Sequence, residues 1–358
     1  MEEIINSQTN ALGINEFLNS AKDYTSNAFP DLDIMKLFSD SITGDVGNIF
    51  SYTNIGKIFT SEIHAAVNLM VSVLIIIIIH SIFKAIIENL GNSTASNVVY
   101  FVQYLIITTV VINSFVSILS ITREAITNVI NFMNLLIPLM TTLMLTTGSL
   151  VTTSMVEPIL LFLMSFIGNF INSFLIPILL ISITISIVSN FSDKIQIDRL
   201  SKFLKSSIVW SLGIILTIFT CTLSLEGNLS SSVDGLTAKT AKATVSTFIP
   251  VVGKIMGDTV DSVIGCSNIL KNSVGIIGVI IIIGIVLIPI IKMGILWFSF
   301  RLTSSVCEIV ADGKIVKLID QISDSYKILM AILISVSVMF IIGITIVIKI
   351  TNSALMYR

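Results

Sequence analysis

The sequence predicts an all-α, polytopic membrane protein with about eight transmembrane helices and an amphipathic helical hairpin. Of its 358 residues, 54% are hydrophobic and 12% are charged, against roughly 25% charged residues in ordinary soluble domains. The hydrophobic residues collect into long runs, and about 20 helical residues cross a hydrocarbon core about 30 Å thick. A membrane β-barrel would show short alternating segments instead. The spans are therefore predicted to be helices.

The net charge and the cysteines indicate which partners and cofactors to expect. The net charge of −2 gives no general attraction to nucleic acid, and the lipid bilayer is the partner that the composition indicates. The three cysteines, Cys221, Cys266 and Cys307, are widely separated and have neither metal-binding nor redox spacing. We therefore expect no metal site, no cofactor and no disulfide framework.

Residues 1–63 form an acidic, polar amino-terminal segment. It carries nine Asp or Glu residues against only Lys22, Lys36 and Lys57. Short helix-like patterns occur in it, such as Ile34 with Leu37 and Phe38. No basic start followed by an apolar stretch is visible, so no signal peptide is predicted. This segment is expected to be soluble or interfacial, and extracytoplasmic.

The first membrane region, 64–224, is predicted to hold about six spans. The segment 155–190 is the difficult part, because its 36 residues would make about 54 Å of helix. It contains Pro158 and Pro177 and a polar break at Asn169 and Asn172, so it is interpreted as two short spans, with one unsplit span as the alternative. The six predicted spans are 65–87, 98–120, 132–153, 155–170, 172–190 and 203–224.

Residues 225–272 are predicted to form the amphipathic hairpin. Ala238, Ala241 and Val245 share one helical face, with Lys239 and Lys242 on another. Asp234 or Thr237 could cap the start of this helix. Pro250 then interrupts the pattern, and a second apolar stripe follows.

The hairpin also carries glycines at regular spacing. Gly253, Gly257 and Gly265 recur on one face of its second helix, where small residues allow another backbone to approach closely. One interpretation is an interfacial hairpin packed on the bundle, and the other is a re-entrant element that lines a pathway. The candidate partner or pathway residues are Asp234, Lys239, Lys242, Pro250, Gly253, Gly257 and Gly265.

The carboxyl-terminal membrane region, 273–358, is predicted to contain two spans, 273–298 and 328–350. The loops 191–205 and 299–327 are rich in Lys and Arg, so both are expected to face the cytoplasm. With eight spans, the amino-terminal segment, the hairpin and the carboxyl terminus then lie on the opposite side.

Three sequence runs carry a family resemblance. DGLTAKTAK at 234–242, FIPVVGK at 248–254 and KNSVGIIG at 271–278, in this order, resemble the stage III sporulation protein AE family. The resemblance is specific from about Asp234 to Ile350, and the earlier span pattern is compatible with it. It implies a membrane subunit of the secretion-like channel complex between mother cell and forespore, located in the mother-cell membrane that surrounds the forespore. The implied partners are other subunits of that complex.

The sequence fits two other functional classes less well. An autonomous secondary transporter is suggested by the helix count, the glycine-rich hairpin and prolines such as Pro138 and Pro289 within apolar runs. An enzyme is not expected, because the chain has only His64 and His80, no H-E-x-x-H metal pair and no phosphate-binding glycine loop.

Overall fold

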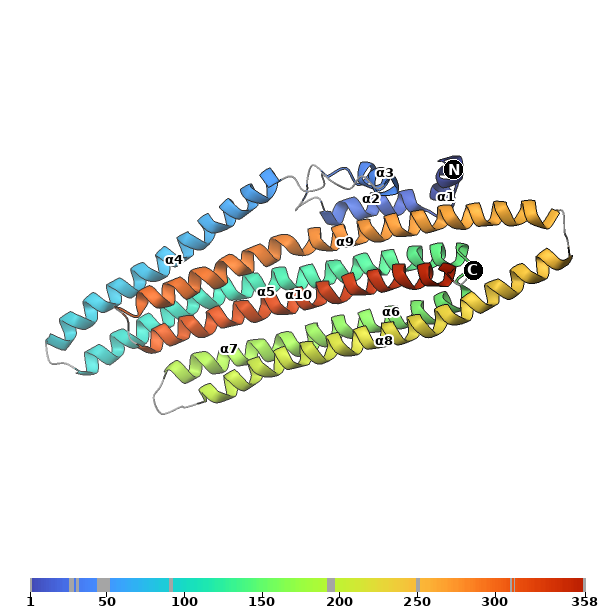
Figure 1. The fold of residues 1–358 in the computed structure, drawn as a ribbon. Coiled ribbons are helices and arrows are strands. Elements are labelled where there is room, and N and C mark those ends of the chain that lie inside the picture. Colours follow the sequence, from blue (N-terminus) through green and yellow to red (C-terminus); the bar gives the residue numbers. More distant parts are fainter. Residues whose placement is uncertain are drawn as a thin grey trace.

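The computed structural model describes residues 2–25, 29, 32–43, 52–89, 93–191, 197–248, 252–309, 311 and 313–356. Within these ranges the chain forms α-helices and one π turn, and no strand occurs in them. Most of the helices run alongside one another as an elongated bundle (Figure 1). The predicted all-α class is confirmed.

Three short helices begin the chain: α1 (Glu2–Ala11), α2 (Ile14–Thr25) and α3 (Ile34–Thr43). They are amphipathic, and α2 and α3 turn apolar residues such as Leu18 and Leu37 inward. In α2, the rings of Phe17 and Tyr24 pack on Phe132, at centroid distances of 5.9 and 5.7 Å. The acidic segment therefore lies along the bundle and covers part of its apolar surface (Figure 1).

Six long helical segments follow. Each is long and apolar enough to cross a membrane, so the prediction of a helical membrane protein is confirmed. Three of them have 51 to 56 residues, which corresponds to about 75–85 Å. They exceed a hydrocarbon core of about 30 Å, so each must extend beyond it. The segments are α4 (Tyr52–Asn89), α5 (Ser93–Thr146), α6–η1–α7 (Leu150–Phe170, Ile171–Leu175, Ile176–Phe191), α8 (Asp198–Phe248), α9 (Val252–Cys307) and α10 (Gly313–Met356).

The structure has six long segments where eight spans were predicted, because two pairs of predicted spans each form one continuous helical segment. The first is the pair 98–120 and 132–153, most of which lies on the single helix α5. The charged residues Arg123 and Glu124 do not end that helix, because neither residue breaks helical geometry. The turn comes later, at Gly148, whose φ of +81° is a conformation that glycine adopts readily.

The second pair lies in 155–190, which was interpreted as two spans and forms one continuous helical segment. Pro177 has no N–H to donate four residues back, and the turn before it widens into the π turn η1, where the Ile176 N–H reaches the Ile171 carbonyl. The helix thus accommodates Pro177 and continues in the same direction. Asn169 and Asn172 lie within the helix rather than in a turn.

The predicted hairpin region is made of the ends of two long helices. Residues 225–272 are the ends of α8 and α9, continuous with the neighbouring apolar segments. Figure 1 shows these two ends extending past the rest of the bundle. The predicted break at Pro250 falls between the two helices, and Pro250 itself lies outside the described residues.

The basic loops meet at one end of the bundle, where α7 connects to α8 and α9 connects to α10 (Figure 1). The turn after α5 and the carboxyl terminus lie toward the opposite end. Because two pairs of predicted spans merged, the number of crossings stays even. The prediction that the amino-terminal segment lies on the side opposite the basic loops is therefore unchanged, and it stays a prediction.

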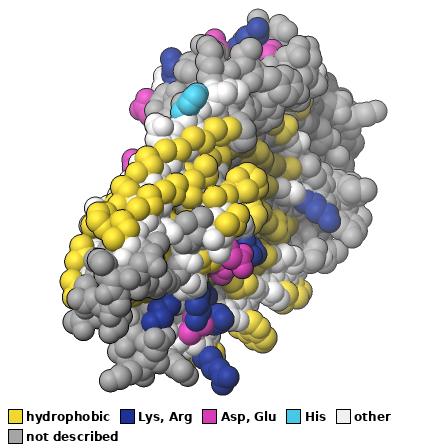
Figure 2. All heavy atoms as spheres, turned by 90° about the vertical axis from the view of Figure 1, so that its left-hand side faces the viewer, with side chains coloured by type: hydrophobic (Ala, Val, Ile, Leu, Met, Phe, Trp, Pro, Cys, Tyr) yellow, Lys and Arg dark blue, Asp and Glu magenta, His cyan; other side chains and the backbone are white. Residues whose placement is uncertain are grey.

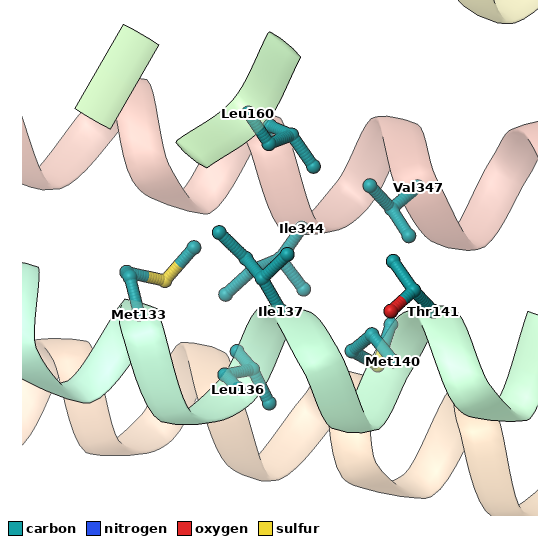
Figure 3. Close-up of a pocket in the computed structure, with 9 residues that line it drawn as sticks. Met133, Leu136, Ile137, Met140, Thr141, Leu160, Ile344 and Val347 are labelled. Atoms are coloured by element: carbon teal, nitrogen blue, oxygen red, sulfur yellow. The ribbon is translucent and has the colours of Figure 1, made fainter. Parts of the chain in front are cut away.

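The core lies between α5, α9 and α10, which pack along much of their length. Its residues are mainly Ile, Leu, Val and Met, and many of them are fully buried. A small cavity of about 10 Å³ lies between α5, α6 and α10, lined by Met133, Ile137, Leu160 and other apolar residues (Figure 3). A cavity of this size sits at the lower limit for one water molecule, and its lining is too apolar to hold one.

Close helix contacts occur at glycines other than those predicted. A Cβ atom on Gly275 would lie 2.3 Å from Cδ1 of Ile348, and one on Gly227 would lie 2.1 Å from Cδ1 of Ile350. Gly265, in contrast, is exposed, and a Cβ atom there would meet nothing within 4 Å. No described part of this chain packs closely on Gly265, so a close contact there with a partner stays a prediction. The side-chain positions of Gly253 and Gly257 lie outside the described part of the chain.

These contacts give a matched pair of substitutions. We expect Gly275→Leu to destabilise the protein by about 1–3 kcal/mol, because the new side chain overpacks the α9–α10 contact. Gly265→Leu, on the same helix, should change stability by less than about 0.5 kcal/mol. Thermal unfolding of both variants in detergent measures the difference, and equal midpoints would contradict the packing.

Candidate functional site

Asp234 joins α8 to the start of α6. Its Oδ1 accepts the N–H of Val151 and its Oδ2 accepts the N–H of Thr152, each at 2.9 Å. The side chain is almost fully buried, at 3% exposed. Asp234 was predicted as a cap for its own helix, but the structure places it as the cap of a different one.

The start of α6 explains why a carboxylate is needed there. The first N–H groups of a helix have no partner within that helix, and Ser149 at the N-cap position makes no side-chain capping bond. A negative charge at a helix amino terminus is also favoured by the helix dipole. Asp234 thus satisfies two backbone donors and holds α6 against α8.

Lys271 lies on α9 with a fully buried side chain. Its Nζ is 3.3 Å from Oδ1 of Asn268 and 3.4 Å from the carbonyl oxygen of Ile348 on α10. A buried ammonium group is costly unless polar groups surround it. The ammonium group of Lys271 has one such polar group on α9 and one on α10. Sequence reasoning used Lys271 only as part of a motif, because nothing in the sequence showed its burial.

A second polar cluster joins α7 and α8 near the basic end of the bundle. Ser201 of α8 lies between Ser182 and Ser186 of α7, with oxygen–oxygen distances of 3.0 Å and 2.6 Å between the hydroxyl groups. The Ser182 hydroxyl also donates to the carbonyl of Ser201 at 3.0 Å. All three serines are buried, so this serine cluster is a close, fully packed contact between two helices.

The serine cluster continues into an ionic network that reaches α10. Asn190 donates to the carbonyl of Ser186 at 2.8 Å and to Oε1 of Gln321 at 2.5 Å. Gln321 in turn donates to Asp198, and its carbonyl accepts the Nζ of Lys205 at 2.5 Å. The network therefore connects α7, α8 and α10 through groups that are largely buried.

Asp198 is the ionic centre of this network. Its Oδ2 lies 3.0 Å from Nζ of Lys317 and 3.3 Å from Nζ of Lys202. As the first residue of α8, it also carries a favourable charge at a helix amino terminus. Its two lysines come from both predicted cytoplasmic loops, so the carboxylate holds these loops together.

Two further ion pairs connect neighbouring helices. Lys292 of α9 lies 3.3 Å from Glu62 of α4, and Arg301 of α9 pairs with Asp320 of α10. Both pairs are partly exposed, so their contribution to stability is small. The first pair connects α9 to α4, and the second connects α9 to α10.

The remaining predicted residues are not brought together by the described contacts. The side chains of Lys239 and Lys242 lie outside the described residues, although their backbone is part of α8. Asp234 is buried, whereas Gly265 is exposed on α9. Among the described residues, no group of three or more His, Cys, Asp or Glu side chains is placed to hold a metal ion.

Comparison with known proteins decides the family. A family model described as stage III sporulation protein AE matches residues 32–351. The chain belongs to this family. It is 33% identical over 286 residues to stage III sporulation protein AE of Bacillus subtilis (strain 168), an alignment that covers 79% of this chain and 72% of that relative. No solved structure matches the chain.

Membership of the stage III sporulation protein AE family confirms the resemblance seen in the three sequence runs. It supports a role in sporulation, and the six long apolar segments make the protein a membrane protein. The runs at 234–242 and 271–278 contain Asp234, Lys271 and Gly275, which make the buried interhelical contacts described above.

Proposed function

We propose that this protein is a membrane subunit of the channel complex between mother cell and forespore, in the mother-cell membrane around the forespore. The proposal rests on family membership, together with the amount of apolar surface that the single chain leaves uncovered. It includes other subunits of that complex as partners and no enzymatic activity.

The uncovered surface is the observation that carries the proposal. Large apolar side chains are exposed along the outer faces of several helices, and Figure 2 shows a broad hydrophobic area next to clustered charges. The helices α5, α8 and α9 are about 75–85 Å long, so lipid about 30 Å thick cannot cover all of their surface. Protein neighbours would cover the rest. Examples of exposed residues are Ile82 on α4, Phe162 on α6, Trp210 on α8 and Phe298 on α9.

An autonomous transporter is the second candidate, and the packing gives it less support. A transporter needs a polar site near the middle of the membrane, whereas the described interior of α5, α9 and α10 is filled mainly with apolar side chains. The cavity in Figure 3 is small and apolar. This packing favours a subunit that forms a pathway together with neighbours.

The test compares the protein alone with the protein in its complex. We expect a tagged chain from sporulating cells to co-purify with other membrane proteins in a fixed ratio. The purified chain by itself should not move solutes across liposomes. Solute transport by the chain alone, without co-purifying partners, would support the transporter instead.

The Lys239 and Lys242 pair gives a sharper prediction about partners. The two residues lie three apart on α8, so their side chains share one side of the helix and can face an acidic partner together. Changing both to Glu reverses four units of charge without disturbing the helix pattern. We expect the variant to accumulate in the membrane, fail to co-purify with the complex and lower spore yield.

The control for this variant is Lys22→Glu with Lys36→Glu, which makes the same change of charge at two exposed positions of α2 and α3. Unchanged complex recovery with the Lys239→Glu and Lys242→Glu variant would show that this pair is only a solvated or lipid-facing surface.

A further inference from the structure

The outer face of α6–η1–α7 combines polar and aromatic side chains at a depth where lipid is expected. Ser165, Asn169 and Ser173 are exposed at four-residue spacing. They are accompanied by a ladder of rings with centroid distances of 6.3, 5.9 and 5.0 Å from one ring to the next. The ladder consists of Phe162, Phe166, Phe170 and Phe174.

This face lies within the membrane-spanning part of the segment. No charged residue occurs from Pro158 to Phe191, a stretch of about 50 Å of helix. Every window of about 20 residues within it, the length that crosses a bilayer, contains Asn172 and Ser173, and most windows contain Asn169. An amide group facing lipid tails lacks hydrogen-bond partners, which is unfavourable.

The π turn η1 lies on the same helical segment as this face. In the described part of the chain, Oδ1 of Asn172 is buried without a hydrogen-bond partner. Asn172 belongs to η1, and π turns within α-helices occur frequently at functional sites. This buried acceptor is out of reach of a neighbour on the outer face, so the groups with which such a neighbour could pair are the exposed amide of Asn169 and the exposed hydroxyl groups of Ser165 and Ser173.

We propose that this face binds the same face of a second copy of the protein. Two copies inserted in one membrane have the same orientation, so a two-fold axis relating them runs along the membrane normal. Each residue near that axis then meets its own counterpart at the same depth. Asn carries both donors and acceptors, and so does Ser, so Asn169 and Ser173 are complementary to themselves.

A different subunit or lipid fits this face less well. A helix from another subunit would need polar groups at matching depths, whereas symmetry provides them automatically in a second copy. Lipid tails would cover the phenylalanines but would leave Asn169 without partners. The self-contact depends only on insertion into a membrane and not on the channel proposal.

Cysteine cross-linking in membranes tests the contact directly. The protein is produced in a non-sporulating host without other sporulation proteins, in a background with the exposed Cys221 replaced by Ser. Asn169→Cys and Ser173→Cys are oxidised separately. We expect disulfide-linked dimers from both, because symmetry-related Cα atoms close to the axis fall within disulfide reach.

Val209→Cys, also at an exposed position but on α8, is the matched control and should give about tenfold less dimer. Asn169→Leu, which keeps an apolar face, should lower the dimer fraction about three- to tenfold in the Ser173→Cys background, the range expected for one interhelical hydrogen bond in a membrane. Dimer yields at positions 169 and 173 no higher than at 209 would overturn the proposal. Cross-linking at these positions only to another protein, in sporulating cells, would overturn it as well.

Discussion

Replacing Ser201 by leucine should lower the free energy of unfolding by about 3 kcal/mol. Ser201 is buried between Ser182 and Ser186, with its hydroxyl oxygen 2.6 Å from that of Ser186. A leucine there overpacks the contact between α7 and α8, which costs about 1–3 kcal/mol. It also removes the partner of buried polar groups, at about 1–3 kcal/mol more.

The neighbouring substitutions separate the two causes. Ser201→Ala leaves the space open and removes only the hydroxyl group, so we expect a loss of about 1 kcal/mol. Ser206→Leu places leucine at an exposed position of the same helix and should have little effect. Unfolding midpoints in detergent give the order, and a midpoint for Ser201→Leu equal to that for Ser206→Leu would show that α7 and α8 are not in close contact here.

The sequence was sufficient to predict the class of the protein and its family. Long apolar runs predict membrane helices from the thickness of a bilayer alone, and the runs around Asp234 and Lys271 are distinctive enough to indicate the family. The number of helices was harder to predict. The gap between the predicted spans 98–120 and 132–153 contains Arg123 and Glu124, and the predicted break in 155–190 contains Asn169 and Asn172. Helical geometry tolerates all four residues, and a π turn accommodates Pro177.

The polar contacts could not be predicted for a different reason. Asp234 and Val151 are 83 positions apart, and Asn190 and Gln321 are 131 apart. No local pattern links such residues, and their contact depends on how long helices align. Even the start of α6 gives no local signal, because Ser149 is a favoured residue at the N-cap position and only the structure shows that its side chain makes no capping bond.

Glycine spacing illustrates the same limit. Gly253, Gly257 and Gly265 share a face by helical periodicity, yet among the glycines that the structure describes the close approaches occur at others, such as Gly227 and Gly275. Spacing shows which glycines share a face of one helix. It does not show whether another helix lies against that face, which the arrangement of α8, α9 and α10 determines.

Replacing Asp234 by alanine is expected to detach the start of α6 from α8. The carboxylate accepts two backbone N–H groups at 2.9 Å, and the N–H of Thr152 is buried. Loss of a capping side chain costs about 0.5–2 kcal/mol, and leaving a buried donor without a partner adds to this. We expect a total loss of about 2 kcal/mol, measured by thermal unfolding in detergent.

Asp234→Asn refines the test, because it keeps one acceptor oxygen and removes the charge that the helix dipole favours. Its stability should therefore lie between those of the parent and Asp234→Ala. Glu124→Ala removes a carboxylate from an exposed position on α5 and serves as the control, with little change expected. Since α6 and α7 form one segment, weakening its start should also increase proteolytic cleavage near the turn at Gly148. Cleavage that rises equally in Glu124→Ala would show that Asp234 does not hold this helix in place.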